Sequence, residues 1–320
     1  MGGVLAPIVA GAVSVALTWW LAGRGARLLP LDRPNQRSLH QIPVPRTGGV
    51  AVMAGLAAVV PWLSPELRVP AGIALVLALL SFLDDVRGLP VPVRFALHAL
   101  AAAAFLFAQP PANALWFVPL LLGLMWMTNL YNFMDGMDGF SGGMAVVGFG
   151  AMGVAASLGG DEPLALASFA LTAAAAVFLC FNFPPARIFM GDAGSIPLGF
   201  LAGALGLTGW EHGLWPLWFP LLAFAPFVID ATVTLCKRLL RRERVWQAHR
   251  EHYYQRLVRM GWTHRRTVLS EYLLMTVCAT AALISYRQAT AVQAGALAAV
   301  AALFMLLMWR VDRAWKRHSV

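Results

Sequence analysis

Long apolar runs, separated by short polar segments, dominate the chain. A membrane-spanning helix needs roughly 17–25 mostly apolar residues, and lipid leaves helices as the way to satisfy the backbone. The pattern therefore predicts an all-α polytopic membrane protein with about eleven transmembrane helices in a single domain, 1–320. The predicted spans are residues 4–23, 48–64, 69–83, 92–109, 113–130, 140–159, 163–180, 195–210, 214–235, 268–285 and 290–309.

Basic residues fix the expected orientation of these spans. If the connection 24–47 is cytoplasmic, every Lys and Arg except Arg68 and Arg287 falls in or beside a segment on the cytoplasmic side. Lys and Arg concentrate in cytoplasmic loops of membrane proteins. We therefore expect the N-terminus outside and the C-terminus in the cytoplasm. The first apolar run lacks the leading positive charge of a signal peptide, so we interpret it as a span.

Composition agrees with this pattern. Hydrophobic residues make up 59% of the chain and charged residues only 12%, which is far from a soluble globular average. The net charge of +9 does not indicate a nucleic-acid partner, because the basic residues lie in short loops between apolar runs. The expected surroundings are a lipid bilayer.

The stretch Asn129–Gly139 interrupts the apolar pattern at the expected inner end of a span. Asn129, Asn132 and Asp135 recur every three residues and would share a helical face, with Asp138 just beyond. Their oxygens are the ligands that a hard cation such as Mg²⁺ prefers, and ionised groups near membrane depth usually mark a site. An ordinary polar turn needs no such spacing, so the pattern favours a functional site.

Two adjacent carboxylates, Asp84 and Asp85, follow the third apolar run. They repel each other and gain from a nearby cation, although a solvated helix end beside Arg87 explains them equally well. A polyprenyl-diphosphate motif would place a third Asp at position 88. Gly88 occupies that position, which argues against that chemistry.

The third acid motif is in the connection 181–194, where Asp192 stands between Gly191 and Gly194. Prolines end the incoming helix, and Ser195 is a candidate cap for the next one. A helix N-terminus offers free N–H groups to phosphate, whereas the simpler alternative is a re-entrant turn with a capping Asp. All three acid motifs fall on the expected cytoplasmic side.

The connection 237–267 is the largest predicted cytoplasmic loop and holds ten Lys and Arg residues. Part of it fits an amphipathic helix on anionic lipid. His249 and His252, with Arg250 between them, suit a phosphate and a sugar better than lipid headgroups alone. No Cys or third close ligand accompanies the two histidines, which argues against zinc.

Two further polar residues lie inside predicted spans. Asp230 would either pair with a neighbouring basic side chain or face a polar cavity, and the sequence leaves both open. His98, four residues after Arg94, is more typical of a core histidine with a satisfied ring.

Taken together, these motifs resemble those of the polyprenyl-phosphate N-acetylhexosamine-1-phosphate transferases, membrane enzymes of the glycosyltransferase family 4 type. The resemblance runs from Arg37–Ser38–Leu39–His40 and Pro45–Arg46–Thr47–Gly48–Gly49 to the His249 loop. It implies a multi-pass enzyme of the bacterial inner membrane with a cytoplasmic active site. The reaction would transfer a sugar 1-phosphate from a UDP-N-acetylhexosamine to undecaprenyl phosphate and release UMP. Mg²⁺ is the implied cofactor, Mn²⁺ is an alternative, and a homodimer is a further expectation.

The resemblance also implies roles for the acids. Asp84 and Asp85 match a pair assigned to positioning or deprotonating the prenyl phosphate. Asn132 and Asp192 match the positions that hold Mg²⁺. The remaining matched residues are expected to bind substrate, and they are Asp135, Asp138, Arg94, Arg187, His249, Arg250 and His252.

The inner-loop motif departs from the His-x-His-His run usual in peptidoglycan and GlcNAc branches. Here it is His249-Arg-Glu-His252-Tyr-Tyr-Gln255, which looks more like enzymes that initiate O-antigen or similar surface polysaccharides. A lipid-linked initiator for peptidoglycan, teichoic acid or enterobacterial-type GlcNAc polymers stays an alternative. An ion-coupled transporter is the alternative outside the transferases, and it predicts acids near mid-span and an internal repeat.

Overall fold

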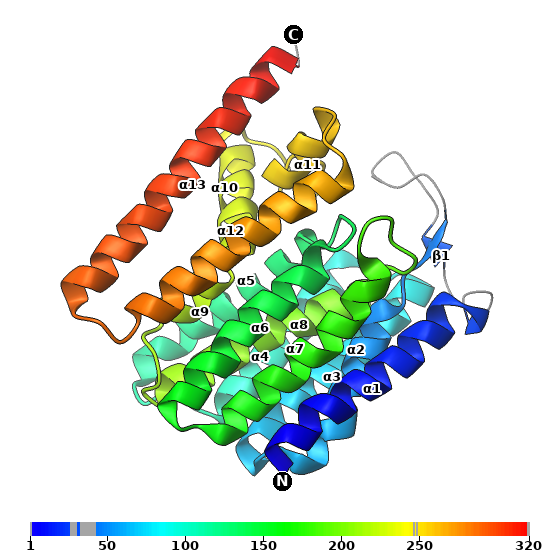
Figure 1. Cartoon of the computed structure of the whole chain (residues 1–320), viewed down its shortest axis with the longest axis vertical. Coiled ribbons are helices and arrows are strands. Elements are labelled where there is room, and N and C mark those ends of the chain that lie inside the picture. The colour runs from blue at the N-terminus through cyan, green and yellow to red at the C-terminus, as the bar shows by residue number, and fades with distance from the viewer. Residues whose placement is uncertain (1, 26–30, 33–42, 246, 248, 319–320) are drawn as a thin grey trace.

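A computed structural model describes residues 2–25, 31–32, 43–245, 247 and 249–318. The Arg37–His40 motif, with Arg27 and Arg33, lies outside these described residues. Nearly all of the described chain is helical (Figure 1). The elements are α1 (Gly2–Ala22), β1 (Leu31–Asp32), β2 (Val44–Pro45), α2 (Gly48–Val59), η2 (Val60–Trp62), α3 (Pro65–Arg87), α4 (Val91–Ala108), η3 (Ala114–Trp116), α5 (Phe117–Phe133), α6 (Phe140–Gly159), α7 (Glu162–Asn182), α8 (Asp192–Glu211), α9 (Trp218–Ala223), α10 (Ala225–Leu240), α11 (Tyr253–Arg259), α12 (His264–Ser285) and α13 (Thr290–His318).

The predicted all-α polytopic fold is confirmed. In the described part of the chain, nine helices are long and apolar enough to cross a membrane. The only sheet found there is the two-residue antiparallel pair of β1 and β2. The two termini lie at opposite ends of the bundle, as an odd number of crossings requires (Figure 1).

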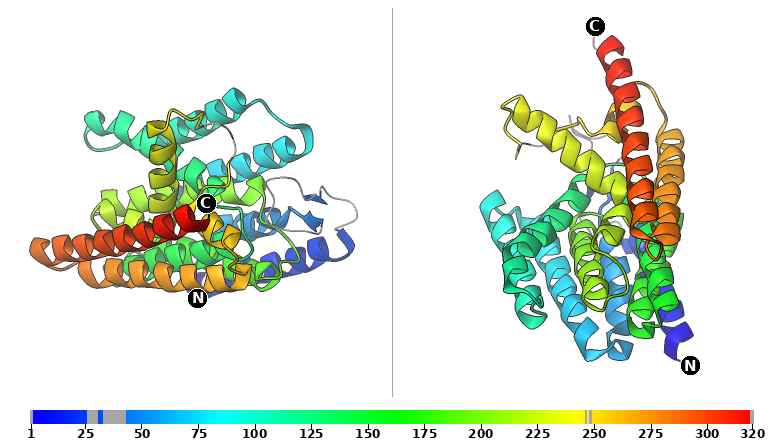
Figure 2. Two further views of the ribbon diagram at one scale, coloured as in Figure 1. Left: turned by 90° about the horizontal axis from the view of Figure 1, so that it is seen from above. Right: turned by 90° about the vertical axis from the view of Figure 1, so that its left-hand side faces the viewer.

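Two of the eleven predicted spans differ from the expectation. The second is a shorter apolar helix, Gly48–Trp62, whose last turn is the 3₁₀ helix η2. The ninth is broken at Phe224 into α9 and α10. Pro226 lies in the first turn of α10. Proline has no backbone N–H to donate and disfavours a helical conformation of the residue before it, so a new helix begins here instead of α9 continuing. Figure 2 shows α10 leaning away from the bundle after this break.

The helix α8 forms the centre of the bundle and is almost wholly buried. It packs against α2, α3, α5 and α6. Glycine and alanine recur along it, which lets neighbouring backbones approach closely, as small residues do in membrane helix packing. The fold therefore places the N-terminus of α8, at Asp192, in the middle of the end of the bundle that carries the acid motifs, which is called the inner end here, and the opposite end is called the outer end.

Two of the three acid motifs lie on helix ends rather than in loops. Asp84 and Asp85, expected just after a span, belong to the last turns of α3, which ends at Arg87. Asp192 is the first residue of α8. Helix geometry therefore fixes the direction of these three carboxylates, because each belongs to a helical turn packed in the bundle.

Candidate active site

The site begins with the carboxylates at the end of α3. Asp84 accepts a hydrogen bond from the backbone N–H of Leu89 and lies 3.5 Å from the guanidinium of Arg94. The Asp85 side chain is only 2% exposed and forms an ion pair with Arg46. Gly88, in the left-handed conformation, ends the helix and turns the chain toward α4, which carries Arg94. The two acids are thus held by two different arginines.

Arg46 reaches Asp85 because the segment before α2 is bound to the segment before α8. The N–H of Phe189 donates to the Pro45 carbonyl at 2.7 Å, and the N–H of Gly49 donates to the Met190 carbonyl at 2.8 Å. At Gly191 the backbone has φ of +72°, and a Cβ there would overlap the Arg46 carbonyl oxygen. Only glycine meets both conditions, so this residue fixes the position of Arg46.

Asn132 and Asp192 come together at the N-terminus of α8. The hydroxyl of Ser195 donates to the Asn132 Oδ1 at 2.8 Å, one turn beyond Asp192. The Asp192 carboxylate lies 3.9 Å from the Arg94 guanidinium, which also faces Asp84. Arg94 therefore joins Asp84 to Asp192, and Asn132 contacts the first turn of the same helix through Ser195.

Asp135 lies at the same end of the bundle, in the turn after α5. Its carboxylate accepts a hydrogen bond from the Ser141 hydroxyl at 2.6 Å and another from the Gly191 N–H. The pKa of Asp135 is raised to about 7, mainly by burial and also by the nearby charges of Asp192 and Asp85, while the two hydrogen bonds oppose this rise. This region holds the four carboxylates of Asp84, Asp85, Asp135 and Asp192 beside the two guanidinium groups of Arg46 and Arg94.

We tested whether these residues fit a divalent metal. Within the described ranges, no three His, Cys, Asp or Glu side chains form a preformed cage. Mg²⁺ does not require one, because it is usually held by one or two carboxylates plus substrate phosphates and water. The Asp192 carboxylate and the Asn132 carbonyl oxygen supply hard oxygen donors beside further acids, and the Asn132 oxygen keeps a second lone pair. The donor set therefore fits Mg²⁺.

Two predicted substrate-binding residues have other partners. The Asp138 carboxylate accepts the Ala186 N–H at 3.0 Å and lies 3.4 Å from a ring nitrogen of His264. Arg187 is exposed, and its guanidinium lies 4.7 Å from the centre of the Phe181 ring. These contacts hold the 183–191 segment, and the roles of both residues toward a substrate stay predictions.

A cavity of about 660 Å³ opens beside the acids, between α4, α5, α10 and the inner loop. Arg94 and Asn132 line it at the acid end, and His249 and His252 line it from the loop. Most of the remaining wall is apolar, and it consists of Val91, Phe95, Trp126, Phe133, Ile196, Leu235 and Leu239. The same cavity therefore has charged groups at one end and a largely apolar wall.

With this geometry in place, comparisons with known proteins identify the family. The family model "Glycosyl transferase family 4" matches residues 67–209, which include every acid of the three motifs. A protein of Bacillus subtilis (strain 168), named as a probable undecaprenyl-phosphate N-acetylglucosaminyl 1-phosphate transferase, is 30% identical over 79% of this chain and 76% of its own length. The chain belongs to glycosyl transferase family 4. The resemblance to polyprenyl-phosphate N-acetylhexosamine-1-phosphate transferases is thereby confirmed.

Other relatives of this family-4 chain are similar over most of their length. An undecaprenyl-phosphate alpha-N-acetylglucosaminyl 1-phosphate transferase of Yersinia pestis is 28% identical over 89% of this chain and 85% of the relative. A decaprenyl-phosphate N-acetylglucosaminephosphotransferase of Mycolicibacterium smegmatis (strain ATCC 700084 / mc(2)155) is 29% identical over 86% and 80%.

The inner loop of this family-4 chain presents two histidines to the cavity, with ring centres 4.8 Å apart. His249 is half-buried, and burial lowers its pKa to about 4, helped by the nearby His252 and the Arg238 guanidinium. Its ring is therefore neutral near pH 7. The predicted site residue Arg250, also in this loop, does not line the cavity, and its carbonyl accepts a hydrogen bond from Arg259.

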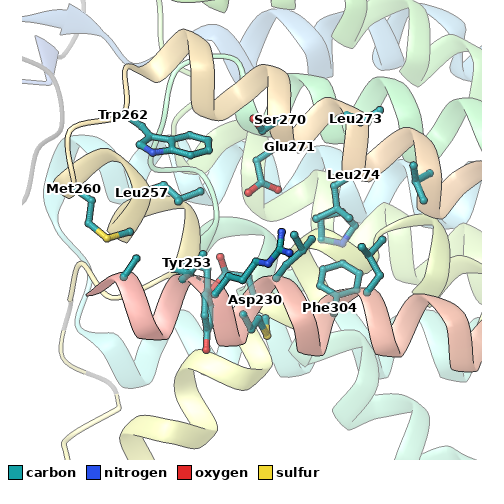
Figure 3. Close-up of a pocket in the computed structure, with 18 of the residues that line it drawn as sticks. Asp230, Tyr253, Leu257, Met260, Trp262, Ser270, Glu271, Leu273, Leu274 and Phe304 are labelled. Carbon is teal, nitrogen blue, oxygen red and sulfur yellow. Dashed lines mark hydrogen bonds between the residues drawn. The ribbon is translucent and has the colours of Figure 1, made fainter. Parts of the chain in front are cut away.

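A larger cavity of about 990 Å³ lies on the other side of α10, mainly between α12 and α13 (Figure 3). Its walls are mostly apolar, with Asp230 and Glu271 among the polar lining residues. None of the acid-motif residues lines it, so size alone does not locate the chemistry of this family-4 site.

Sequence reasoning missed three contributors to the site. Arg46 was noted only within a Pro-Arg-Thr-Gly-Gly motif, whereas it forms the ion pair of Asp85. Ser195 was expected to cap a helix and instead donates to Asn132. His98 is buried as expected, but its Nδ1 contacts the Asn129 Oδ1 at 3.2 Å and its side chain lines the cavity. The adjacent glycines after Arg46 were the available signal for a close approach.

Proposed function

We propose that this family-4 protein transfers an N-acetylhexosamine 1-phosphate from a UDP-sugar to undecaprenyl phosphate, at the cytoplasmic side of a bacterial inner membrane. An oxygen of the lipid phosphate attacks the sugar-bearing phosphorus of the donor. The phosphorus–oxygen bond to UMP breaks, and UMP leaves with that electron pair. The product is undecaprenyl-diphosphate-sugar.

One observation carries the proposal. Arg94 and Asn132 line one end of a cavity whose wall is largely apolar, and the ends of α3 and α8 bring Asp84 and Asp192 against Arg94, with Asp85 next to Asp84. A reaction between a prenyl phosphate and a nucleotide diphosphate needs such a combination, because a hydrocarbon chain and several negative charges must meet. The transporter alternative predicts acids near mid-span, and here the motif acids gather at the ends of their helices.

The residues of the cluster have separate tasks in this reaction. Arg46 and Arg94 hold the α3 carboxylates and offer positive charge to the phosphates. Asp84 or Asp85 accepts a proton from the lipid phosphate or positions it for direct attack. Phosphoryl transfer depends mainly on positioning and on charge neutralisation, and the two arginines beside three carboxylates suit both.

A divalent cation completes the proposal. Asp192 and Asn132 would hold Mg²⁺, and Mn²⁺ is an alternative. When bound, such an ion screens the diphosphate and stabilises the charge that develops on the leaving phosphate. Asp135 supports the ligands indirectly, because its hydrogen bond from Gly191 fixes the residue before Asp192.

We further propose N-acetylglucosamine as the first sugar to test, since the named relatives from three genera are N-acetylglucosaminyl or N-acetylglucosamine phosphotransferases. The O-antigen-like role follows from the His249 loop motif alone. A homodimer is kept as a hypothesis.

The decisive experiment incubates the purified full chain with undecaprenyl phosphate, Mg²⁺ and a panel of UDP-sugars, and measures UMP release. We expect release with UDP-N-acetylglucosamine or another UDP-N-acetylhexosamine, together with a lipid-diphosphate-sugar product. UMP release that does not depend on the lipid, or no release with any donor, would reject the proposal.

A further inference from the structure

The sequence left open the role of Asp230, a buried carboxylate of α10 that is 5% exposed. It borders the larger cavity, close to Tyr253 in the view of Figure 3. A charged group inside an apolar helix is costly unless its oxygens are satisfied, so its partners indicate its purpose.

Both oxygens of Asp230 face the start of α11 in the inner loop. Oδ1 accepts from the Tyr253 N–H at 3.0 Å and from the Thr234 hydroxyl at 2.9 Å, and it lies 3.2 Å from the His252 Nδ1. Oδ2 accepts from the Tyr254 N–H at 3.3 Å. Three of these four partners belong to consecutive residues of the loop.

These bonds fix the position of a very short helix. The helix α11 has seven residues, too few to be stable alone. His252 is its N-cap, and the His252 N–H donates to the Gln255 side chain at 3.2 Å. Asp230 takes the first free N–H groups of the helix and places a negative charge at its N-terminus, which is favourable there. The start of α11 is therefore attached to α10.

The same carboxylate determines which nitrogen of His252 carries the proton. A carboxylate only accepts hydrogen bonds, so the Nδ1 of His252 must donate, and in the neutral ring Nε2 is then an acceptor. His249 has the opposite arrangement, because its Nδ1 accepts the Glu251 N–H at 3.3 Å and its neutral ring carries the proton on Nε2. Both rings line the 660 Å³ cavity beside Arg94 and Asn132.

We propose that Asp230 is a positioning residue that holds His252 in the Nδ1-protonated form, so that His249 and His252 present one donor and one acceptor to the sugar-nucleotide. A sugar hydroxyl or acetamido group offers both hydrogen-bonding roles and matches such a pair. The inference rests on the proposed function for the identity of the ligand. The predicted protonation of His252 on Nδ1 does not depend on the proposed function, and it can be measured without any substrate.

The experiment compares Asp230→Asn with Thr234→Val in the purified full chain. In Asp230→Asn the negative charge that favours an Nδ1 proton is lost. An amide nitrogen in the place of Oδ1 donates toward Nδ1 and favours the other tautomer of His252, at the cost of the bond that Oδ1 accepts from the Tyr253 N–H, while the Tyr254 N–H keeps its acceptor. Thr234→Val removes a neighbouring hydrogen bond to Asp230 and leaves the contact with His252. Ring ¹⁵N chemical shifts at pH 8, assigned with a His252→Gln variant, report the tautomer, and UMP release reports kcat and KM.

We expect Nδ1 protonation of His252 in the wild type and a shift toward Nε2 protonation in Asp230→Asn. The value of kcat/KM should fall about 10- to 100-fold in Asp230→Asn, as for other partners that orient a functional histidine, and less than about 3-fold in Thr234→Val. Asp230→Asn combined with His252→Gln should cost no more than His252→Gln alone, because both changes remove one function.

Each other outcome is decisive. Wild-type protonation on Nε2, or full activity of Asp230→Asn, overturns the inference. Additive losses in the double variant show that Asp230 acts only by stabilising the fold. If Asp230→Asn does not fold, His252→Phe replaces it, since it retains the backbone bonds to Asp230, and full activity of that variant overturns the inference. Nδ1 protonation in a wild type that releases no UMP rejects the proposed function alone.

Discussion

The two ends of the bundle each carry a cluster of ionisable side chains, and the clusters differ in balance. At the outer end, His212 bridges Asp161 at 2.7 Å and Glu66 at 2.9 Å. At the inner end, carboxylates from α3, α5 and α8 surround two arginines and border a cavity. The outer cluster joins α3 to the N-terminus of α7 and the end of α8. The inner cluster holds more carboxylates than arginines, and their mutual repulsion adds to the effect of burial in raising the pKa of Asp135.

The comparison shows how a structural ion-pair cluster differs from a ligand site. In the structural cluster every charged group has a partner of opposite charge, whereas a ligand site keeps excess charge of one sign. The outer histidine has carboxylate partners on both ring nitrogens, so the cluster stabilises the fold and needs no ligand. The inner acids repel one another, which costs stability and favours a cation or a cationic partner. Variants of the inner cluster should therefore reduce activity, whereas variants of the outer cluster should reduce stability and leave activity unchanged.

The largest expected effect is the loss of transfer in Asp192→Asn. The change removes a charge that would hold the metal, and charge stabilisation of this kind is worth several kcal/mol; about 4 kcal/mol corresponds to about 10³-fold in rate. UMP release by the inserted, folded variant is the measurement. Asp161→Asn, the matched change at the outer end, should keep the wild-type rate. Substantial activity in Asp192→Asn would contradict the metal assignment.

A smaller loss is expected for Arg46→Gln, about 10- to 100-fold in kcat/KM. The variant leaves the buried Asp85 carboxylate without its ion pair and removes a charge-assisted contact next to the phosphates. Arg87→Gln is the control, because this arginine lies at the end of the same helix as Asp85 and is exposed. Equal losses of activity in the two variants would show that the total positive charge of the inner end matters, and that the placement of Arg46 beside Asp85 does not.

Mg²⁺ should stabilise the protein through the inner cluster alone. An ion that binds only the folded state at about 100 times its dissociation constant contributes about 2.7 kcal/mol. Thermal unfolding with and without Mg²⁺ measures this effect. The shift in Tm should appear in the wild type and in His212→Gln and be largely absent from Asp192→Asn. An equal shift in Asp192→Asn would place the ion elsewhere.

The sequence predicted most of the fold and the convergence of the acids, and the reasons are physical. Span length and the distribution of Lys and Arg are local properties, so they placed Asp84, Asn132 and Asp192 at one end of the bundle. Arg46, Ser195 and the capping role of Asp230 depend on hydrogen bonds between segments far apart in the chain. No local pattern records such bonds, and for the same reason the actual partners of Asp138 could not be foreseen.

The smallest effect, and the sharpest test of the contrast, is expected for His212→Gln at the outer end. Its neighbours Asp161 and Glu66 raise the pKa of His212 despite the opposing effect of partial burial. The charged ring therefore stabilises the folded state fully below its unfolded pKa, about 6.5, and this contribution is lost as the pH rises through the higher folded value. Partly exposed ion pairs contribute about 0.5 kcal/mol, so His212→Gln should lower Tm slightly at pH 5.5 and leave it nearly unchanged at pH 9. The rate of UMP release should match the wild type at pH 7.5. A loss of activity there, with Tm unchanged, would mean that the outer cluster communicates with the inner site and that the two ends are not independent.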